Sequence, residues 1–584
     1  LKDAAATALY GSRAANGVIV IETVAPQPGK LRVSYDFTGE LTMPDISDYN
    51  LMDASEKLEA ERLAGFYDYN PEEHITSYHS KLKEYQQKLN NVKAGVNTDW
   101  IALPLRNPFN HKHSLFVEGG SEAVRFGITM RYDMQNGVMK GSDRSRFGAS
   151  FQLDYRTEKL QLRNEVSYDV TKGKDSPYGD FSEYTTRLPY VSYKDAEGNY
   201  LETLPWHSTS TVTGNSNNPY YEAKLMKNFS YQNYSTLTDN LGVNWYIMDG
   251  LQAKGQFSIT KTDEWSENFV DPESGTFKAD PFSEQDEFLE KGSLLKTDSE
   301  TITWSFKAFA NYVKTLGKHN VNFSVGVELN ETRYQYESQN FRGFPSGELH
   351  SPMYAETADD PSFSDNHTRL SSVYAALNYS FQDIYLLDAS WRTDGSSEFG
   401  TDNKTASFYA AGVGVNFHKY AFLSNCAWLS QLRLTGTYGQ TGKVNFPPYA
   451  AKHTYQIMDT YYGTGNGVNL FYMGNDDLTW EKTNEVNVRF VLGLFQENIT
   501  LEADWYNKQT KDLITDVTIP TSTGYSSYKD NLGEVRNRGY ELILRANVFH
   551  NEDWDVILHG NLAHNENKIM KISESLKDYN NRVD

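Results

Sequence analysis

The sequence lacks the features that mark several common protein classes. Its 584 residues contain a single cysteine, Cys426, which excludes an internal disulfide framework and a cysteine zinc cluster. It has no run of about 18 apolar residues, so it contains no transmembrane helix. Cationic residues are outnumbered, 55 Lys and Arg against 77 Asp and Glu. The net charge of −22 argues against a nucleic-acid-binding surface, because phosphates need a cationic face.

Catalytic signatures are missing too. The sequence has no HExxH motif, no GxSxG motif and no cysteine pair. The segment GQTGKV lacks the earlier glycine of a P-loop and the Ser or Thr after Lys443. GTGNGV (463–468) follows no buried strand, so it is not a dinucleotide site. The sequence therefore predicts no enzyme, no cofactor and no nucleotide site.

One histidine pair has the spacing of metal ligands. His111 and His113 stand two residues apart just before a predicted strand, and on a strand this spacing places both on one face. A weak metal site is one interpretation, and a solvated strand end is the one we favour. The polar clusters at 194–200 and 474–477 resemble turns and miss the calcium-loop spacing. We expect no bound metal.

The sequence is rich in aromatic residues, 14% with 40 Tyr, and its apolar residues alternate with polar ones. In LRVSYDFTGEL (31–41) every second residue is apolar or glycine and the others are charged or hydroxylated. Similar alternation recurs at 146–155, 485–490, 501–506 and 541–548. This pattern predicts strands with one apolar and one charged face.

Short and long connections alternate between these strands. Short polar turns are predicted at 119–122, 156–159, 247–250, 315–318, 381–383, 495–497 and 550–553, with a longer one at 419–430. The long connections are predicted at 42–112, 134–143, 171–228, 264–299, 334–366, 393–404, 442–479 and 510–532. All the long ones then leave one end of the sheet, as in an outer-membrane barrel.

The pattern predicts an all-β fold, a transmembrane antiparallel β-barrel wall of about 17 strands, because closure removes the edges of so large a sheet. The soluble alternatives are a β-sandwich array, a propeller and a β-helix. The absence of a repeat near 40–50 residues counts against the propeller. Among the predicted strands, one segment within 51–92 has helical spacing, and it lies inside the first long connection.

The first residues carry a resemblance to a known family. LKDAAATALYGSRAANGVIVIET forms, by its local pattern, a helix, a glycine turn and a buried strand. It resembles the segment that ends the plug domain of SusC/RagA-type TonB-dependent outer-membrane transporters. The matching positions that we single out as the plug motif are Asp3, Tyr10, Gly11, Arg13, Asn16 and Gly17.

Further stretches are similar to that family in the same order along the chain. They include NTDW (97–100) and YLLDASWRTDGSSEFG (385–400), in which Glu398 stands where Arg is commoner, as well as LTWEKTNEVNVRF and NLGEVRNRGYEL. The resemblance covers essentially the whole chain except the tips of the long loops.

The resemblance implies a 22-stranded barrel that encloses a plug. We expect residues 1–24 to be the C-terminal end of an α/β plug domain lying in the lumen. Residues 25–30 would be a linker, and 31–584 about the first 17 barrel strands. On this interpretation the barrel is incomplete here, and the sequence is the central part of a longer polypeptide.

The family's known activity is active uptake across the outer membrane of Gram-negative bacteria. The resemblance implies a SusD-like surface lipoprotein as a lid, TonB acting on the plug through a segment outside this chain, and a barrel surrounded by outer-membrane lipid. It also implies that the seventh and eighth long loops, 442–479 and 510–532, hinge the lid. The cargo would be an oligosaccharide, which we favour, or a peptide as in the RagA branch.

Aromatic residues in the long loops are the candidates for contact with cargo, because they stack on sugar rings and pack against peptides. The six that we single out are Trp206, His207, Phe341, Tyr461, Tyr462 and Phe471. Packing within their own loops is the competing explanation for each. Two other functions stay open: a non-transporting outer-membrane binding or adhesion protein, and a soluble β-rich carbohydrate enzyme.

Overall fold

The computed structural model describes residues 25–68, 70, 72, 74–206, 215–277, 291–400, 403–463 and 465–572. The predicted plug segment 1–24, with Asp3, Tyr10, Gly11, Arg13, Asn16 and Gly17, lies outside these ranges, as does His207. None of the helices in the described part of the chain is long and apolar enough to cross a membrane.

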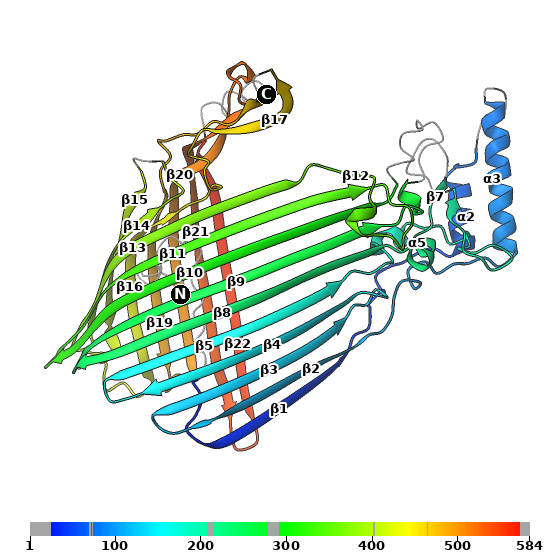
Figure 1. The fold of residues 1–584 in the computed structure, drawn as a ribbon. Coiled ribbons are helices and arrows are strands. Elements are labelled where there is room, and N and C mark those ends of the chain that lie inside the picture. The colour runs from blue at the N-terminus through cyan, green and yellow to red at the C-terminus, as the bar shows by residue number, and fades with distance from the viewer. Residues whose placement is uncertain are drawn as a thin grey trace.

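One antiparallel sheet dominates the fold (Figure 1). Among the described residues it has 18 strands, one of which, β12 (Thr357–Ala358), is a two-residue addition beside β11. The other strands follow one another in chain order and match the predicted number of 17. They are β1 (Gly29–Leu41), β2 (Phe109–Gly120), β3 (Val124–Asn136), β4 (Asp143–Arg156), β5 (Leu160–Lys174), β8 (Phe229–Met248), β9 (Leu251–Val270), β10 (Ser293–Leu316), β11 (His319–Arg342), β13 (Ser362–Phe381), β14 (Tyr385–Ser396), β15 (Thr405–Asn416), β16 (Leu429–Lys443), β19 (Glu481–Leu494), β20 (Ile499–Thr518), β21 (Ser527–His550) and β22 (Asp555–Lys571).

The sheet curves into an open barrel wall. In Figure 1 the later strands, up to β22, pass behind the earlier ones. Within the described ranges no pairing joins β1 to β22, so both strands are edges. An all-β fold with an antiparallel barrel wall is therefore confirmed, and this wall is not closed.

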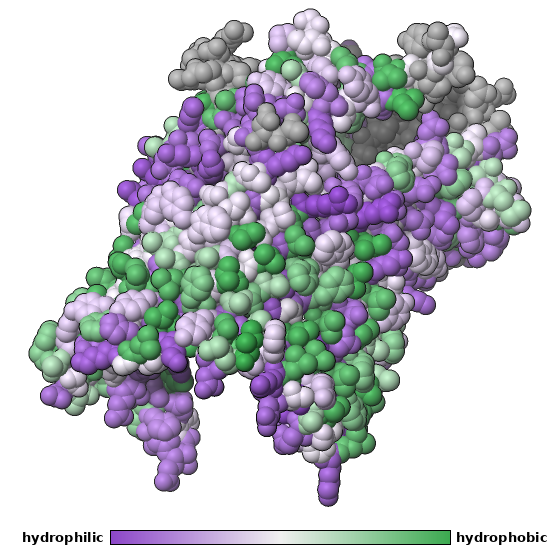
Figure 2. Space-filling view, turned by 60° about the vertical axis from the view of Figure 1, so that its left-hand side comes forward, coloured by the Kyte–Doolittle hydropathy of each residue, from purple (hydrophilic) through white to green (hydrophobic). Residues whose placement is uncertain are grey.

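The predicted alternation of faces is confirmed along the strands. In the middle of β19, Val486 and Val488 lie on the face that also carries Trp505 of β20, and all three are exposed. On the opposite face Glu485 is buried and pairs with Lys508, their charged atoms 3.2 Å apart. Figure 2 shows the apolar side chains gathered in a band across the outer wall, with hydrophilic residues above it. A barrel in lipid needs such an apolar outer band, and its lumen can be polar.

The connections differ in length at the two ends of the wall, as predicted. The hairpin turns β2–β3, β4–β5, β8–β9, β10–β11, β13–β14, β19–β20 and β21–β22 span two to four residues, and β15–β16 is longer. The predicted long connections are correct in place but too long. For example, 264–299 is reduced to 271–292 and 510–532 to 519–526, because β9, β10, β20 and β21 extend further than the alternation indicates. β1 likewise begins at Gly29 rather than at residue 31.

The long connections build structure of their own at one end. The first contains α2 (Ala54–Leu63) and α3 (Ile75–Lys93), which confirms the helices predicted within 51–92. The third contains α4 (Phe181–Thr185), α5 (Pro219–Leu225) and the strand pair β6 (Thr203–Pro205) and β7 (Asn215–Asn217). The seventh contains the hairpin β17 (Thr454–Tyr462) and β18 (Gly465–Tyr472), a sheet separate from the wall. The described part of the long connections also contains the 3-10 turns η2 (Gly275–Phe277), η4 (Pro352–Tyr354) and η6 (Thr521–Thr523). A further 3-10 turn, η5 (Phe417–Lys419), lies at the other end of the wall, between β15 and β16.

Candidate ligand-binding site

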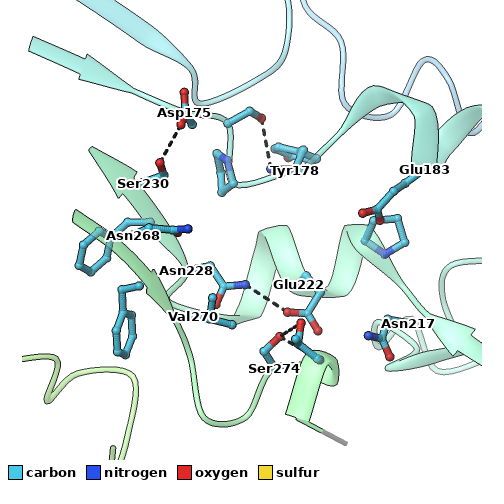
Figure 3. A pocket seen from close by; sticks show the side chains of 17 residues that line it. Asp175, Tyr178, Glu183, Asn217, Glu222, Asn228, Ser230, Asn268, Val270 and Ser274 are labelled. Atoms are coloured by element: carbon cyan, nitrogen blue, oxygen red, sulfur yellow. Dashed lines mark hydrogen bonds between the residues drawn. The ribbon is translucent and has the colours of Figure 1, made fainter. Parts of the chain in front are cut away.

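A cavity of about 260 Å³ lies at the loop end of the wall, where β5 ends, β8 begins and β9 ends. The third and fourth long connections close it, through α4, α5, β7 and η2 (Figure 3). Its lining is mixed, with carboxylates, amides, hydroxyls and aromatic rings. The residues are Asp175, Ser176, Pro177, Tyr178, Gly179, Glu183, Asn217, Pro219, Glu222, Asn228, Phe229, Ser230, Asn268, Phe269, Val270, Ser274 and Thr276.

Glu222 is held at the base of this cavity by partners from two other segments. Helix α5 begins where Asn218 caps the amide of Tyr220 and Pro219 occupies the first turn, and Glu222 follows in that turn. Its carboxylate accepts the backbone N–H of Gly275 at 2.7 Å. It also accepts the side-chain amide of Asn228 at 3.2 Å (Figure 3). These bonds tie α5 to the start of β8 and to η2, so the carboxylate has a fixed position.

The opposite wall is polar as well. The hydroxyl of Ser230 donates to Asp175 at 2.7 Å, and the backbone N–H of Asp175 donates to the carbonyl of Ser230 at 3.0 Å. The Glu183 carboxyl lies 3.7 Å from the Arg187 guanidinium, and burial raises the pKa of Glu183 above its usual range. The cavity therefore presents several oxygen acceptors that a ligand hydroxyl or amide could reach.

Aromatic rings form the remaining surface. Phe229 and Phe269 stack with centroids 5.4 Å apart, and Phe269 is fully buried. Tyr178, which is also buried, meets Tyr220 edge to face at 5.6 Å. A cavity that combines apolar rings with a few fixed polar groups is typical of small-molecule sites.

Beside the cavity the first and third connections share one hydrophobic core. Its buried members are Ala54, Leu58, Tyr67, Trp100, Tyr178, Tyr184, Tyr190, Val191 and Leu204. The parts of the first and third connections that pack on this core are called the loop module below. Lys88 lies inside this module, with only 2% of its side chain exposed. Its ammonium is 2.8 Å from Glu84 and 3.3 Å from Glu61. Tyr190 also donates to Glu61, at 2.7 Å, so one buried network joins α2, α3 and the third connection.

The two tyrosines of this network, Tyr67 and Tyr190, hydrogen-bond to Glu61. Burial, together with these hydrogen bonds, raises the pKa of each phenol well above its ordinary value. Both stay neutral donors at any physiological pH.

A second core lies under the sixth and seventh connections. Its buried residues are Phe399, Phe408, Phe446, Ala450, Ala451, Leu478 and Trp480. Phe399 and Trp480 pack with centroids 4.8 Å apart. Glu398, the position where the resembled family more often has Arg, is next to this core, and burial raises its pKa. The base of the seventh connection is thus anchored, while its hairpin is not part of the wall.

The sequence-predicted aromatics occupy different environments, and their contact with cargo stays a prediction. Trp206 packs on the shared core of the first and third connections, its ring 5.7 Å from the Lys88 ammonium. Phe341, on β11, packs against the cluster of Phe269, Leu294 and Phe344 behind the cavity. Phe471, on β18, is 64% exposed. The side chains of Tyr461 and Tyr462, also on that hairpin, lie outside the described part, as does His207.

Sequence reasoning missed the polar residues of the cavity. The pair Asn218–Pro219 is a helix-start signal inside a long connection, and it could have drawn attention to Glu222. No local pattern, however, brings Glu222 to Gly275, which is 53 residues away.

Comparisons with known proteins agree with this architecture. Residues 154–584 match the family described as TonB dependent receptor-like, beta-barrel. The TonB-dependent receptor P39 of Formosa agariphila is 26% identical over 588 residues, covering 98% of this chain and 52% of that protein. The TonB-dependent receptor SusC of Bacteroides thetaiotaomicron is 26% identical over 611 residues, covering 98% of this chain and 56% of that protein.

A solved structure shows the same fold. The RagAB peptide importer in its open-open state superposes with a TM-score of 0.80 at 23% identity, covering 98% of this chain and 64% of that chain. This chain spans about half the length of the curated relatives it matches. The resemblance to SusC/RagA-type transporters that the sequence shows is confirmed by these homologues. The chain belongs to the TonB-dependent receptor β-barrel family.

Proposed function

We propose that this chain is the barrel region of an outer-membrane transporter that imports a large ligand, with energy delivered by TonB and with a SusD-like lipoprotein as lid. Family membership supports the transporter class, and the loop-end cavity is the observation that supports binding of cargo at the outer rim. The division into residues 1–24 as the end of the plug, a linker at 25–30 and the barrel from 31 onward is part of this proposal.

The wall supports an outer-membrane location. Its outer face carries an apolar band (Figure 2), and its other face carries charged pairs such as Lys508 with Glu485 and Arg392 with Glu328. A barrel with this distribution can stand in lipid while a polar ligand moves through its lumen. The proposal requires no nucleotide, since the proton gradient of the inner membrane supplies the energy through TonB.

The proposed cargo is an oligosaccharide. Fixed acceptors such as Glu222 and Asp175 can accept hydrogen bonds from sugar hydroxyls, and Asn268 can both donate and accept. The rings of Tyr178 and Phe229 offer faces on which a sugar ring can pack. The cavity holds one small unit, so longer cargo would place a terminal residue there and extend over the rim.

A peptide is the competing cargo. Its support is the fold shared with the RagAB peptide transporter, at 22% identity. A peptide backbone could bond the same amides and carboxylates, but it would use the aromatic faces less regularly than a chain of sugar rings would.

Uptake by cells tests the function. Cells that express the full-length protein and its lid lipoprotein should take up labelled oligosaccharides, and a proton uncoupler should stop uptake while leaving surface binding unchanged. The Asn268→Ala variant should weaken binding about tenfold through the loss of a ligand hydrogen bond. Asn233→Ala, on β8 outside the cavity, is the matched control.

Three outcomes would contradict the proposal in different ways. Uptake of peptides alone would overturn the cargo but keep the transporter. Binding that is never followed by uncoupler-sensitive uptake would identify a binding or adhesion protein. Equal affinity of the Asn268→Ala variant and the unmodified protein would exclude the cavity as the binding site.

A further inference from the structure

The histidine pair that the sequence singled out lies on the outer face of the wall, near its loop end. His111 and His113 are inside β2 rather than before it, which corrects the predicted position. His113 is opposite Phe37 of β1 and Tyr132 of β3, and His111 is opposite Gly39 and Met134. Both side chains are partly buried among these neighbours.

The two imidazoles meet through one nitrogen of each ring. Nδ1 of His111 and Nε2 of His113 are 3.2 Å apart, and the ring planes meet at 70°. Two nitrogens bound to one tetrahedral Zn²⁺ at about 2.0–2.1 Å would stand about 3.3–3.4 Å apart. The observed separation of the nitrogens, which is also that of a hydrogen bond between the two rings, differs from this chelating distance by only about 0.1–0.2 Å.

The surroundings complete the pattern of a ligating histidine. Nδ1 of His113, the nitrogen that faces away from His111, is 2.6 Å from the hydroxyl of Tyr35. Metal-bound histidines usually hydrogen-bond through their second ring nitrogen, which fixes the tautomer and the ring orientation. Phe37 and Tyr132 pack on the His113 ring at 5.2 and 6.5 Å and restrict its rotation.

We propose that His111 and His113 form a chelating site for a divalent transition-metal ion, with Zn²⁺ as the reference ion. Nδ1 of His111 and Nε2 of His113 are the ligands, and Tyr35 accepts the Nδ1–H of His113. No third His, Cys, Asp or Glu joins a metal-binding group in the described ranges, so the remaining coordination positions are open to water or to an anion. This site is independent of the proposed transport function.

The location gives the ion access from outside. β2 begins at Phe109, two residues before His111, and the long first connection precedes it. The pair is thus near the rim of the apolar band, where water and lipid headgroups meet the wall. Both ligands are on one strand, so the ion does not cross-link neighbouring strands. Binding of the ion should therefore leave the stability of the wall nearly unchanged.

Titration of the metal tests the site. The full-length protein, purified in detergent and stripped with EDTA, is titrated with Zn²⁺ by calorimetry and with Co²⁺ by visible absorption. We expect one ion per chain, with His111→Gln and His113→Gln each abolishing the Co²⁺ band. Tyr35→Phe should weaken binding by about 10–100-fold, because the second shell is lost.

His319→Gln is the matched control. His319 also lies against a tyrosine, with Nδ1 2.7 Å from the hydroxyl of Tyr379, but its ring packs against Tyr379 and Phe381 rather than against a histidine. Its variant should bind as tightly as the unmodified protein. Unchanged binding in the double variant His111→Gln/His113→Gln, or no binding by the unmodified protein, would overturn the proposal. Equal melting temperatures of all variants confirm that folding is not the cause of a loss.

Discussion

Lys88 shows how one residue can organise a module that the barrel wall does not support. A buried ammonium is costly unless it is paired, and here two carboxylates and the hydroxyl of Tyr67 surround it. The rings of Tyr190 and Trp206 lie within 5.7 Å of the same charge. Because these partners come from α2, α3 and the third connection, Lys88 joins three segments at a single point.

Replacing Lys88 by Met should destabilise this module by about 3–5 kcal/mol, because Glu61 and Glu84 would lose the charge that compensates their burial. The measurement is amide hydrogen exchange of residues 54–93 in the full-length protein. Lys81→Met is the control, since Lys81 pairs with Glu84 at 2.8 Å but is 26% exposed, and it should cost about 0–1 kcal/mol. Similar exchange rates in both variants would show that the network does not hold the module.

At the level of the strand, the two faces of β19 should respond differently to the same charge. Val488 is on the outer face at mid-strand, and its neighbour Asn487 is on the lumenal face. An arginine at the midplane of the lipid costs about 2–4 kcal/mol, whereas a lumenal arginine meets polar surroundings. Val488→Arg should therefore lower the unfolding free energy in lipid vesicles by that amount, and Asn487→Arg should change it little. If Asn487→Arg destabilised the protein more than Val488→Arg, the lipid would contact the face that carries Asn487.

Strands, turns and their number were predictable because one local rule governs them. Alternation in residues such as Val486, Asn487 and Val488 is imposed by lipid on one side and charge on the other. The alternation weakens where a strand extends beyond the lipid, because both faces of the sheet then meet water. Glu264 and Ser299 lie in such a region. That is why β9 and β10 continue their pairing beyond the predicted ends.

The candidate site was not predictable in the same way. Asp175, Glu222 and Gly275 belong to connections that have no periodic pattern, and they meet only because the wall brings the ends of β5, β8 and β9 side by side. The described long-loop aromatics lie at the same end of the wall as the candidate cavity. They could not indicate which rings would line a cavity and which would pack inside a module, as Trp206 does.

For the molecule as a whole, the hairpin β17–β18 is the part that stands outside the wall (Figure 1). It exposes apolar side chains, including Tyr455, Ile457, Val468 and Phe471. Apolar residues exposed together on a surface often mark a contact with a partner. Under the proposed function, that partner is the lid lipoprotein.

Deleting residues 454–472 should therefore abolish co-purification of the lid, because its apolar contact is removed, while the wall keeps its resistance to heat in detergent. Ile457→Ser/Phe471→Ser is the milder test, since it keeps the hairpin and removes two exposed apolar side chains. It should weaken the complex in pull-down assays. If both variants still co-purify with the lid, the lid contacts another part of the rim.

The unequal lengths of the connections also affect how such a protein can evolve. A turn of two to four residues sets the register of its hairpin, so it tolerates almost no change in length, whereas the long connections accept insertions. Under the proposed function, selection by cargo and selection by phages or antibodies would then act on the same rim. A mutation in segment 42–108 or 175–228 that prevents attachment of a phage would also alter the binding of cargo.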